Sequence, residues 1–89
     1  MSLNKTFAAL ADPTRRKILT LLKRKELSVN EMAINFDITL PSLSHHLTIL
    51  KNAGLISYRR RGQQLIYSLN LSIFEEVAKE LYNFFNKKI

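Results

Sequence analysis

Two adjacent histidines, His45 and His46, are the side chains best suited to chemistry in this sequence, since they are its two imidazoles and it has no cysteine. Neighbouring residues of a helix point about 100° apart, so this pair cannot chelate one metal ion as an i, i+4 pair can. No serine or carboxylate stands at a spacing that suggests a catalytic triad. Catalysis is therefore disfavoured, and no cofactor is expected.

The histidines belong to a predicted helix over residues 40–53. Gly54 is expected to end it, because glycine adopts a left-handed conformation without steric cost. Its apolar stripe recurs at helical spacing, and comprises Leu40, Leu43, Leu47 and Leu50. At about 100° per residue, the face opposite the stripe comprises Pro41, Ser42, His45, Thr48 and Ile49, with Ser44 and His46 on the flanks.

This outward face is unusual because it carries short hydrogen-bonding groups and no lysine or glutamate. A helix that merely keeps a protein soluble usually carries charges on its free face. Serine, threonine and histidine instead suit a helix that lies in a DNA major groove. A polar helix in a small bundle is the alternative interpretation.

A second helix is predicted just before this one. Ser28 and Glu31 form a capping-box pattern, and an apolar face follows at Val29, Met32, Ala33 and Phe36. Residues 37–39 interrupt the pattern, with Thr39 as a cap for the next helix. The two segments together predict a helix-turn-helix.

A β-hairpin is predicted over residues 56–69, because side chains alternate with period two on both sides of Gly62. Its tip joins guanidinium and amide groups, which bind phosphates and can enter a narrow minor groove. An ordinary charged loop tip is the alternative. The candidate DNA contacts in this wing are Arg59, Arg60, Arg61, Gln63 and Gln64.

Helices are also predicted at both ends of the chain. Leu3, Phe7 and Leu10 begin the first, and Asp12 with Pro13 begins a second, whose Arg15 and Arg16 could reach a phosphate. A capping-box pattern at Ser72 and Glu75 begins the last. Its aromatic residues exceed what a small core needs, which favours a symmetric dimer. The expected dimerisation residues are Leu3, Phe7, Phe74, Val77, Leu81, Phe84 and Phe85.

Composition agrees with a nucleic-acid partner. The 89 residues carry a net charge of +7, and residues 40–70 contain four basic residues and no acidic one. A segment without carboxylates is suited to lie against phosphates. The length predicts a single domain over residues 1–89, and the absence of a membrane span or signal segment predicts a cytoplasmic protein.

The whole pattern predicts a mainly α fold with a small β-hairpin, the winged helix-turn-helix. Three ordered segments resemble the ArsR/SmtB family of bacterial repressors, and within it the SdpR-type autorepressors: LADPTRRKILTLL, PSLSHHLTILKNAGLI and RRRGQQLIYSL. The resemblance implies a homodimer joined through its terminal helices and an operator in double-stranded DNA that is read by residues 40–53. It places the base-reading positions at Ser42, Ser44, His45 and His46.

The chain departs from the family's metal-sensing members, which the resemblance associates with cysteines near residues 30–36 or with Asp, His and Glu pairs on the last helix. Those cysteines are absent, and Glu75, Glu76 and Glu80 have no histidine beside them. No metal site is therefore expected. Release from DNA is left to dilution of the dimer, to a small-molecule ligand, or to a sequestering partner protein that the resemblance suggests is membrane-bound. A winged helix used only for protein contacts is the remaining alternative function.

Overall fold

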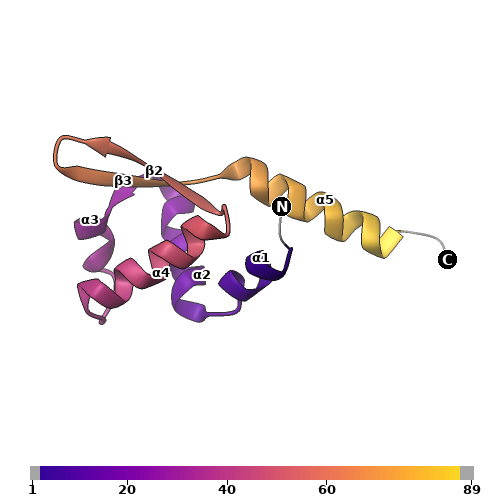
Figure 1. Ribbon diagram of the computed structural model, residues 1–89, viewed down its shortest axis with the longest axis horizontal. Coiled ribbons are helices and arrows are strands. Elements are labelled where there is room, and N and C mark those ends of the chain that lie inside the picture. The colour runs from indigo at the N-terminus through magenta and orange to yellow at the C-terminus, as the bar shows by residue number, and fades with distance from the viewer. Residues whose placement is uncertain (1–2, 87–89) are drawn as a thin grey trace.

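The computed structural model describes residues 3–86 and confirms a mainly helical winged helix-turn-helix with a small antiparallel sheet (Figure 1). The elements in chain order are α1 (Leu3–Leu10), α2 (Pro13–Arg24), β1 (Leu27–Ser28), α3 (Val29–Ala33), α4 (Leu40–Asn52), β2 (Ile56–Arg61), β3 (Gln64–Leu69) and α5 (Leu71–Asn86). No described helix is both long and apolar enough to cross a membrane.

Most helix ends lie where local sequence predicts them. Asp12 caps α2 by accepting from the Arg15 amide, and Thr39 caps α4 by accepting from the Ser42 amide. The capping box of Ser28 and Glu31 is formed in both directions, although α3 itself ends at Ala33 rather than at Phe36.

Gly54 ends α4 in a Schellman arrangement. Its φ is +78°, and the amide of Leu55 donates to the carbonyl of Leu50 at 3.0 Å, while the amide of Gly54 donates to the carbonyl of Lys51 at 2.9 Å. These two bonds satisfy carbonyls that the end of a helix otherwise leaves free. The chain can therefore turn directly from α4 into β2.

The sheet has the strand order β1-β3-β2, with both pairs antiparallel. Arg61 pairs with Gln64, so the hairpin turn consists of Gly62 and Gln63 alone. Gly62 has a φ of +62° and Gln63 does not have a positive φ, the combination used by a type II′ turn. The two-residue strand β1 was not predicted, and it joins the segment before α3 to the hairpin through Leu27 and Ser28.

The core is built around α2 and α4. Leu43, Leu47 and Leu50 are buried as predicted, but Leu40 is 51% exposed, so its place in the buried stripe is wrong. Leu40 is the first residue of α4, so it lies at the end of the stripe, beyond the buried Leu43, Leu47 and Leu50. The α2 residues in the core are Ile18, Leu19 and Leu22.

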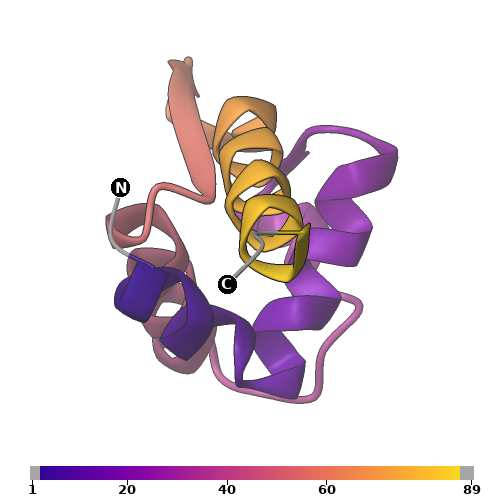
Figure 2. The ribbon, with the colours of Figure 1, turned by 90° about the vertical axis from the view of Figure 1, so that its right-hand side faces the viewer.

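The terminal helices differ in how they meet this core. α1 packs through Thr6 and Ala9, which are buried, and leaves Phe7 45% exposed. α5 runs away from the body at the end opposite the hairpin (Figure 1), and Figure 2 shows it nearly end-on above α1 and α2. Val77 is the one buried residue among those described in α5.

The capping box predicted at Ser72 is wrong. α5 already begins at Leu71, so Ser72 lies in its first turn, where its hydroxyl donates to Asn70 Oδ1 at 2.8 Å. Asn70 also binds the turn between α4 and β2, since its side-chain amide donates to the carbonyl of Gly54 at 3.0 Å. Asn70 therefore ties the start of α5 to the end of α4.

Candidate nucleic-acid interface

The outward face of α4 is polar and lacks charged side chains along its first turns. Ser44, His45 and Thr48 are exposed, whereas Ser42 is half-buried. The Thr48 hydroxyl donates to the Ser44 carbonyl at 3.0 Å, which leaves its oxygen lone pairs and methyl group available to a partner. The first half of α4 thus presents small hydrogen-bonding groups to the surroundings.

This face is rotated relative to the one that helical spacing predicted. Ile49 was placed opposite the leucines, but it is half-buried and packs against the core. The cause is α1, whose Ala8 lines the same hollow as Ile49. Because α1 covers this side, the free face of α4 turns toward Ser44 and away from Ser42.

His45 and His46 have different surroundings. His45 is exposed, while the side chain of His46 is 16% exposed and faces α2. Its Nδ1 lies 3.3 Å from Arg15 Nη1 and 3.8 Å from Asp12 Oδ2. The geometry therefore separates the two histidines, one toward the surroundings and one toward the start of α2.

Arg15 and Arg16, in the first turn of α2, both donate to carbonyls at the end of α1. Arg15 donates through Nε to Ala9 at 2.8 Å and through Nη2 to Ala8 at 3.1 Å, and Arg16 donates to Leu10 at 2.7 Å. These carbonyls belong to the last turn of α1, where intrahelical donors run out and cations are stabilising. The phosphate contact considered for Arg15 and Arg16 competes with these bonds.

The wing carries its cations on the far end of the hairpin. Arg60, Arg61, Gln63 and Gln64 are exposed, so a partner can reach them. Arg59 is exposed as well, but it forms an ion pair with Glu26, which precedes β1. Since β1 was not predicted, this acidic neighbour of the wing was not foreseen.

Lys51 links the last turn of α4 to the base of the wing. Its Nζ lies 4.6 Å from the centre of the Tyr58 ring and donates to the Tyr58 hydroxyl at 3.4 Å. The Tyr58 ring lies 5.6 Å from that of Tyr67, whose pKa is raised by burial. This arrangement sets the wing against α4 through aromatic and cation–π contacts.

The terminal helices expose the apolar residues that were assigned to dimerisation. Phe84 and Phe85 are 73% and 77% exposed, with their rings packed edge to face at 5.2 Å. Phe7 and Leu81 are also exposed, and Leu3 and Phe74 are half-buried. Val77 is instead buried within its own chain, so little of it is available to a partner.

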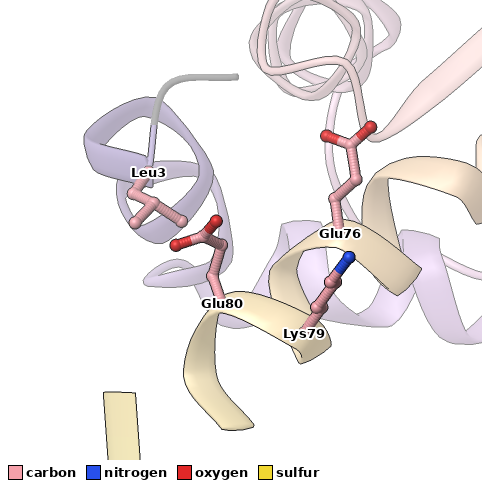
Figure 3. Close-up of a pocket in the computed structure, with 4 residues that line it drawn as sticks. All are labelled: Leu3, Glu76, Lys79 and Glu80. Atoms are coloured by element: carbon pink, nitrogen blue, oxygen red, sulfur yellow. The ribbon is translucent and has the colours of Figure 1, made fainter. Parts of the chain in front are cut away.

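A groove of about 440 Å³ separates α1 from α5, and it is lined by Leu3, Glu76, Lys79 and Glu80. In Figure 3 the carboxylate of Glu80 points toward Leu3, whereas that of Glu76 points away from it. The two carboxylates therefore diverge. Among residues 3–86, no group of three or more His, Cys, Asp or Glu side chains lies together as metal ligands would.

Comparisons with known proteins agree with this geometry. The chain is 47% identical over 85 residues to the transcriptional repressor SdpR of Bacillus subtilis (strain 168), across 96% of this chain and 94% of that one. A crystal structure of an ArsR family transcriptional regulator superposes with a TM-score of 0.78 at 32% identity, across 98% of this chain and 93% of that one.

An ArsR-like transcriptional regulator from Rhodococcus sp. RHA1 gives a TM-score of 0.86 at 29% identity, across 92% of this chain and 75% of that one. Residues 12–58 match the protein family described as bacterial regulatory protein, arsR family. Proteins of this family are DNA-binding transcriptional regulators rather than enzymes. They bind operator DNA and typically act as dimers. The chain belongs to the ArsR family of bacterial transcriptional repressors.

Proposed function

We propose that this repressor binds a palindromic operator as a homodimer, with α4 in the major groove and the β2–β3 wing on the adjacent backbone. The observation that carries the proposal is the acid-free polar face of Ser44, His45 and Thr48 beside the exposed cations of the wing. In a helix-turn-helix, the second helix contacts base edges. In this proposal residues 1–89 form one DNA-binding domain with dimerisation helices at its ends.

The exposed residues divide by chemistry. Ser44, His45 and Thr48 are proposed to read base edges, with Ser42 at the margin of the same face. Arg60 and Arg61 are proposed to hold phosphates. Gln63 and Gln64, at the turn, are proposed to contact the DNA as well, because side-chain amides can bind either the DNA backbone or base edges in a groove.

The dimer is proposed to form through α1 and α5, where large apolar side chains are exposed. Phe7, Leu81, Phe84 and Phe85 are 40–77% exposed, more apolar surface than the end of a monomer normally leaves in water. A two-fold axis through these helices would set two copies of α4 about one DNA turn, roughly 34 Å, apart. An operator with half-sites at that spacing is the corresponding expectation.

The test is a titration of DNA fragments from the protein's own promoter region, with footprinting of the fragment that binds best. We expect a protected, two-fold symmetric site and an affinity at least a hundredfold above that for random duplex. Equal affinity for all fragments, together with tight capture of a protein, would instead support a winged helix that serves protein contacts.

Release from the operator is proposed to follow dilution of the dimer, or capture of its exposed basic and apolar surfaces by a partner protein. The resemblance to SdpR suggests that this partner is membrane-bound. A small-molecule ligand ranks lower, because the one buried residue described in α5 is the apolar Val77, and that helix therefore offers no buried polar side chain to orient a ligand. Metal release ranks lowest, since the chain has no cysteine.

A further inference from the structure

The side chain of Arg15, on α2, connects the end of α1 to α4. Its Nε and Nη2 bind the last carbonyls of α1, its Nη1 lies 3.3 Å from His46 Nδ1 on α4, and its own amide donates to the capping carboxylate of Asp12. All three branches of the guanidinium are therefore used, and each of them ends on a different atom of the chain.

The contact with His46 is a hydrogen bond in one state of that ring. A guanidinium has donors and no acceptor, so the bond requires that Nδ1 accepts and that the ring proton lies on Nε2. Asp12 Oδ2 lies 3.8 Å from the same nitrogen, and its negative charge offsets the positive charge of Arg15. The half-buried ring is thus held from its Nδ1 side, on the flank of α4 that faces the protein.

We propose that Arg15 and His46 are positioning residues for the recognition helix, and that His46 does not read bases. Through His46, Arg15 fixes the rotation of α4 about its own axis relative to α1. A rotation of one residue would move His45 by about 100° and remove it from the groove. The proposal rests on the proposed function in that α4 is the helix that reads DNA.

Arg16 provides the matched control, because it also donates to a carbonyl at the end of α1 but has no bond to α4. Removing either arginine deletes a bond to the end of α1, and only Arg15→Ala also deletes the link to His46. Operator affinity is therefore compared for Arg15→Ala, Arg16→Ala, His46→Ala and the two double variants. The dimer dissociation constant and the melting temperature of each variant are measured in parallel.

We expect Arg15→Ala and His46→Ala each to weaken operator binding on the order of tenfold. In the Arg15→Ala/His46→Ala variant the second loss should add almost nothing, because one link has been removed twice. The separate effects of Arg16→Ala and His46→Ala on operator affinity should instead multiply in their double variant. Additive effects of Arg15→Ala and His46→Ala would overturn the proposal, as would an equal coupling of His46 to Arg16.

Two conservative variants separate positioning from base reading at His46. Asparagine places its amide oxygen near the position of Nδ1, where it can accept from Arg15, whereas glutamine places its amide near Nε2. We expect His46→Asn to keep operator binding within about threefold of the wild type, a change of roughly 0.6 kcal/mol, and His46→Gln to resemble His46→Ala. The reverse order would show that His46 acts through Nε2 on DNA and would overturn the assignment.

A DNA-free measurement distinguishes failure of this proposal from failure of the proposed function. Long-range ¹H–¹⁵N spectra of the intact protein should show His46 as the Nε2–H tautomer near neutral pH. Arg15→Ala should turn it into a tautomer mixture, and Arg16→Ala should leave it unchanged. If no DNA fragment binds the wild type but the spectra show the expected tautomers, the proposed operator binding is wrong and the Arg15–His46 contact is still supported. An unchanged tautomer in Arg15→Ala would overturn the link itself.

Discussion

Glu26 pairs with Arg59 across the edge of the wing. Arg59 Nε lies 3.4 Å from Glu26 Oε2, and Arg59 Nη2 donates to Glu26 Oε1 at 3.5 Å. Both side chains are about half exposed, so the pair contributes only about 0–1 kcal/mol to stability. The pair instead withholds one wing cation from the DNA, because a carboxylate competes with phosphates for the same guanidinium.

Glu26→Gln should therefore strengthen binding to random duplex DNA. With the carboxylate removed, Arg59 becomes free for a phosphate, and the salt slope should steepen by about one unit. The control is Glu75→Gln, which makes the same change in net charge at an exposed position on α5. Equal effects of the two variants would mean that net charge alone matters and that Arg59 is not held back.

His45→Ala should weaken operator binding by about 1–3 kcal/mol and leave random duplex unaffected, because a lost base contact is sequence-specific. Arg60→Gln should weaken both DNAs alike and make the salt slope shallower by about one unit. Affinities are measured across a salt series on both DNAs. A His45→Ala loss that is equal on operator and random duplex would contradict the assignment of His45 as a reader.

The helix caps and the turn were predictable from sequence because they depend on neighbours along the chain. Asp12, Ser28, Thr39 and Gly54 each act within a few residues of their own position. Ser72 was the exception: α5 begins one residue before it, and its hydroxyl donates to the side chain of Asn70. Two capping patterns of the same form thus had different outcomes.

The rotation of α4 and the partners of its flank were not predictable, because they depend on segments distant in sequence. The spacing of leucines cannot show that α1 covers Ile49, nor that Arg15 reaches His46 across 31 positions of the chain. From sequence, Arg15 was considered only as a candidate phosphate contact. The only local signal was the pair of arginines just after Asp12 and Pro13, within reach of the preceding helix end.

Asp12 gives the fold a pH dependence at its acidic limit. The hydrogen bond from the Arg15 amide, followed by the charge of Arg15, holds the pKa of Asp12 below its ordinary value of 3.8. A lowered carboxyl pKa stabilises the fold at pH values above the unfolded-state pKa, and this stability is lost as pH falls through the folded-state pKa.

Asp12→Asn keeps an acceptor at the cap but removes the charge. Wild type should therefore be more stable than Asp12→Asn above about pH 4, and the difference should vanish at lower pH. Urea unfolding of both proteins across this range is the measurement. Glu31, whose pKa is also lowered, titrates equally in both proteins and cancels in the comparison. A difference that does not change with pH would rule out the charge as its origin.

Phe84→Glu should weaken the dimer and operator binding together, because it places a charge on the exposed apolar surface of α5. Asn83→Glu is the control, since it adds the same charge to the neighbouring position, which is also exposed. Equilibrium sedimentation at micromolar concentration gives the dimer fraction, and operator titration gives the affinity. A wild type that sediments as a monomer, or equal effects of the two variants, would argue against dimerisation through this surface.

Metal ions should not release this repressor at the positions used by metal-sensing relatives. Tight transition-metal sites draw on thiolates, imidazoles or grouped carboxylates in a fixed geometry. The chain has no thiol, and its imidazoles lie on α4, one exposed and one bound to Arg15. The carboxylates of Glu76 and Glu80 diverge in the groove between α1 and α5. A metal bound at His45 would compete with DNA directly rather than act at a distance.

The measurement is operator binding at fixed protein concentration with zinc, nickel, cobalt or copper added, each against a chelator control. We expect no release at submicromolar free metal. A His45→Ala/His46→Ala variant separates the two ways in which release could occur. Release that disappears in this variant would reflect direct competition at α4. Release that persists equally in it would require a distant site built from the remaining carboxylates, and the expectation of metal-independent regulation would then be wrong.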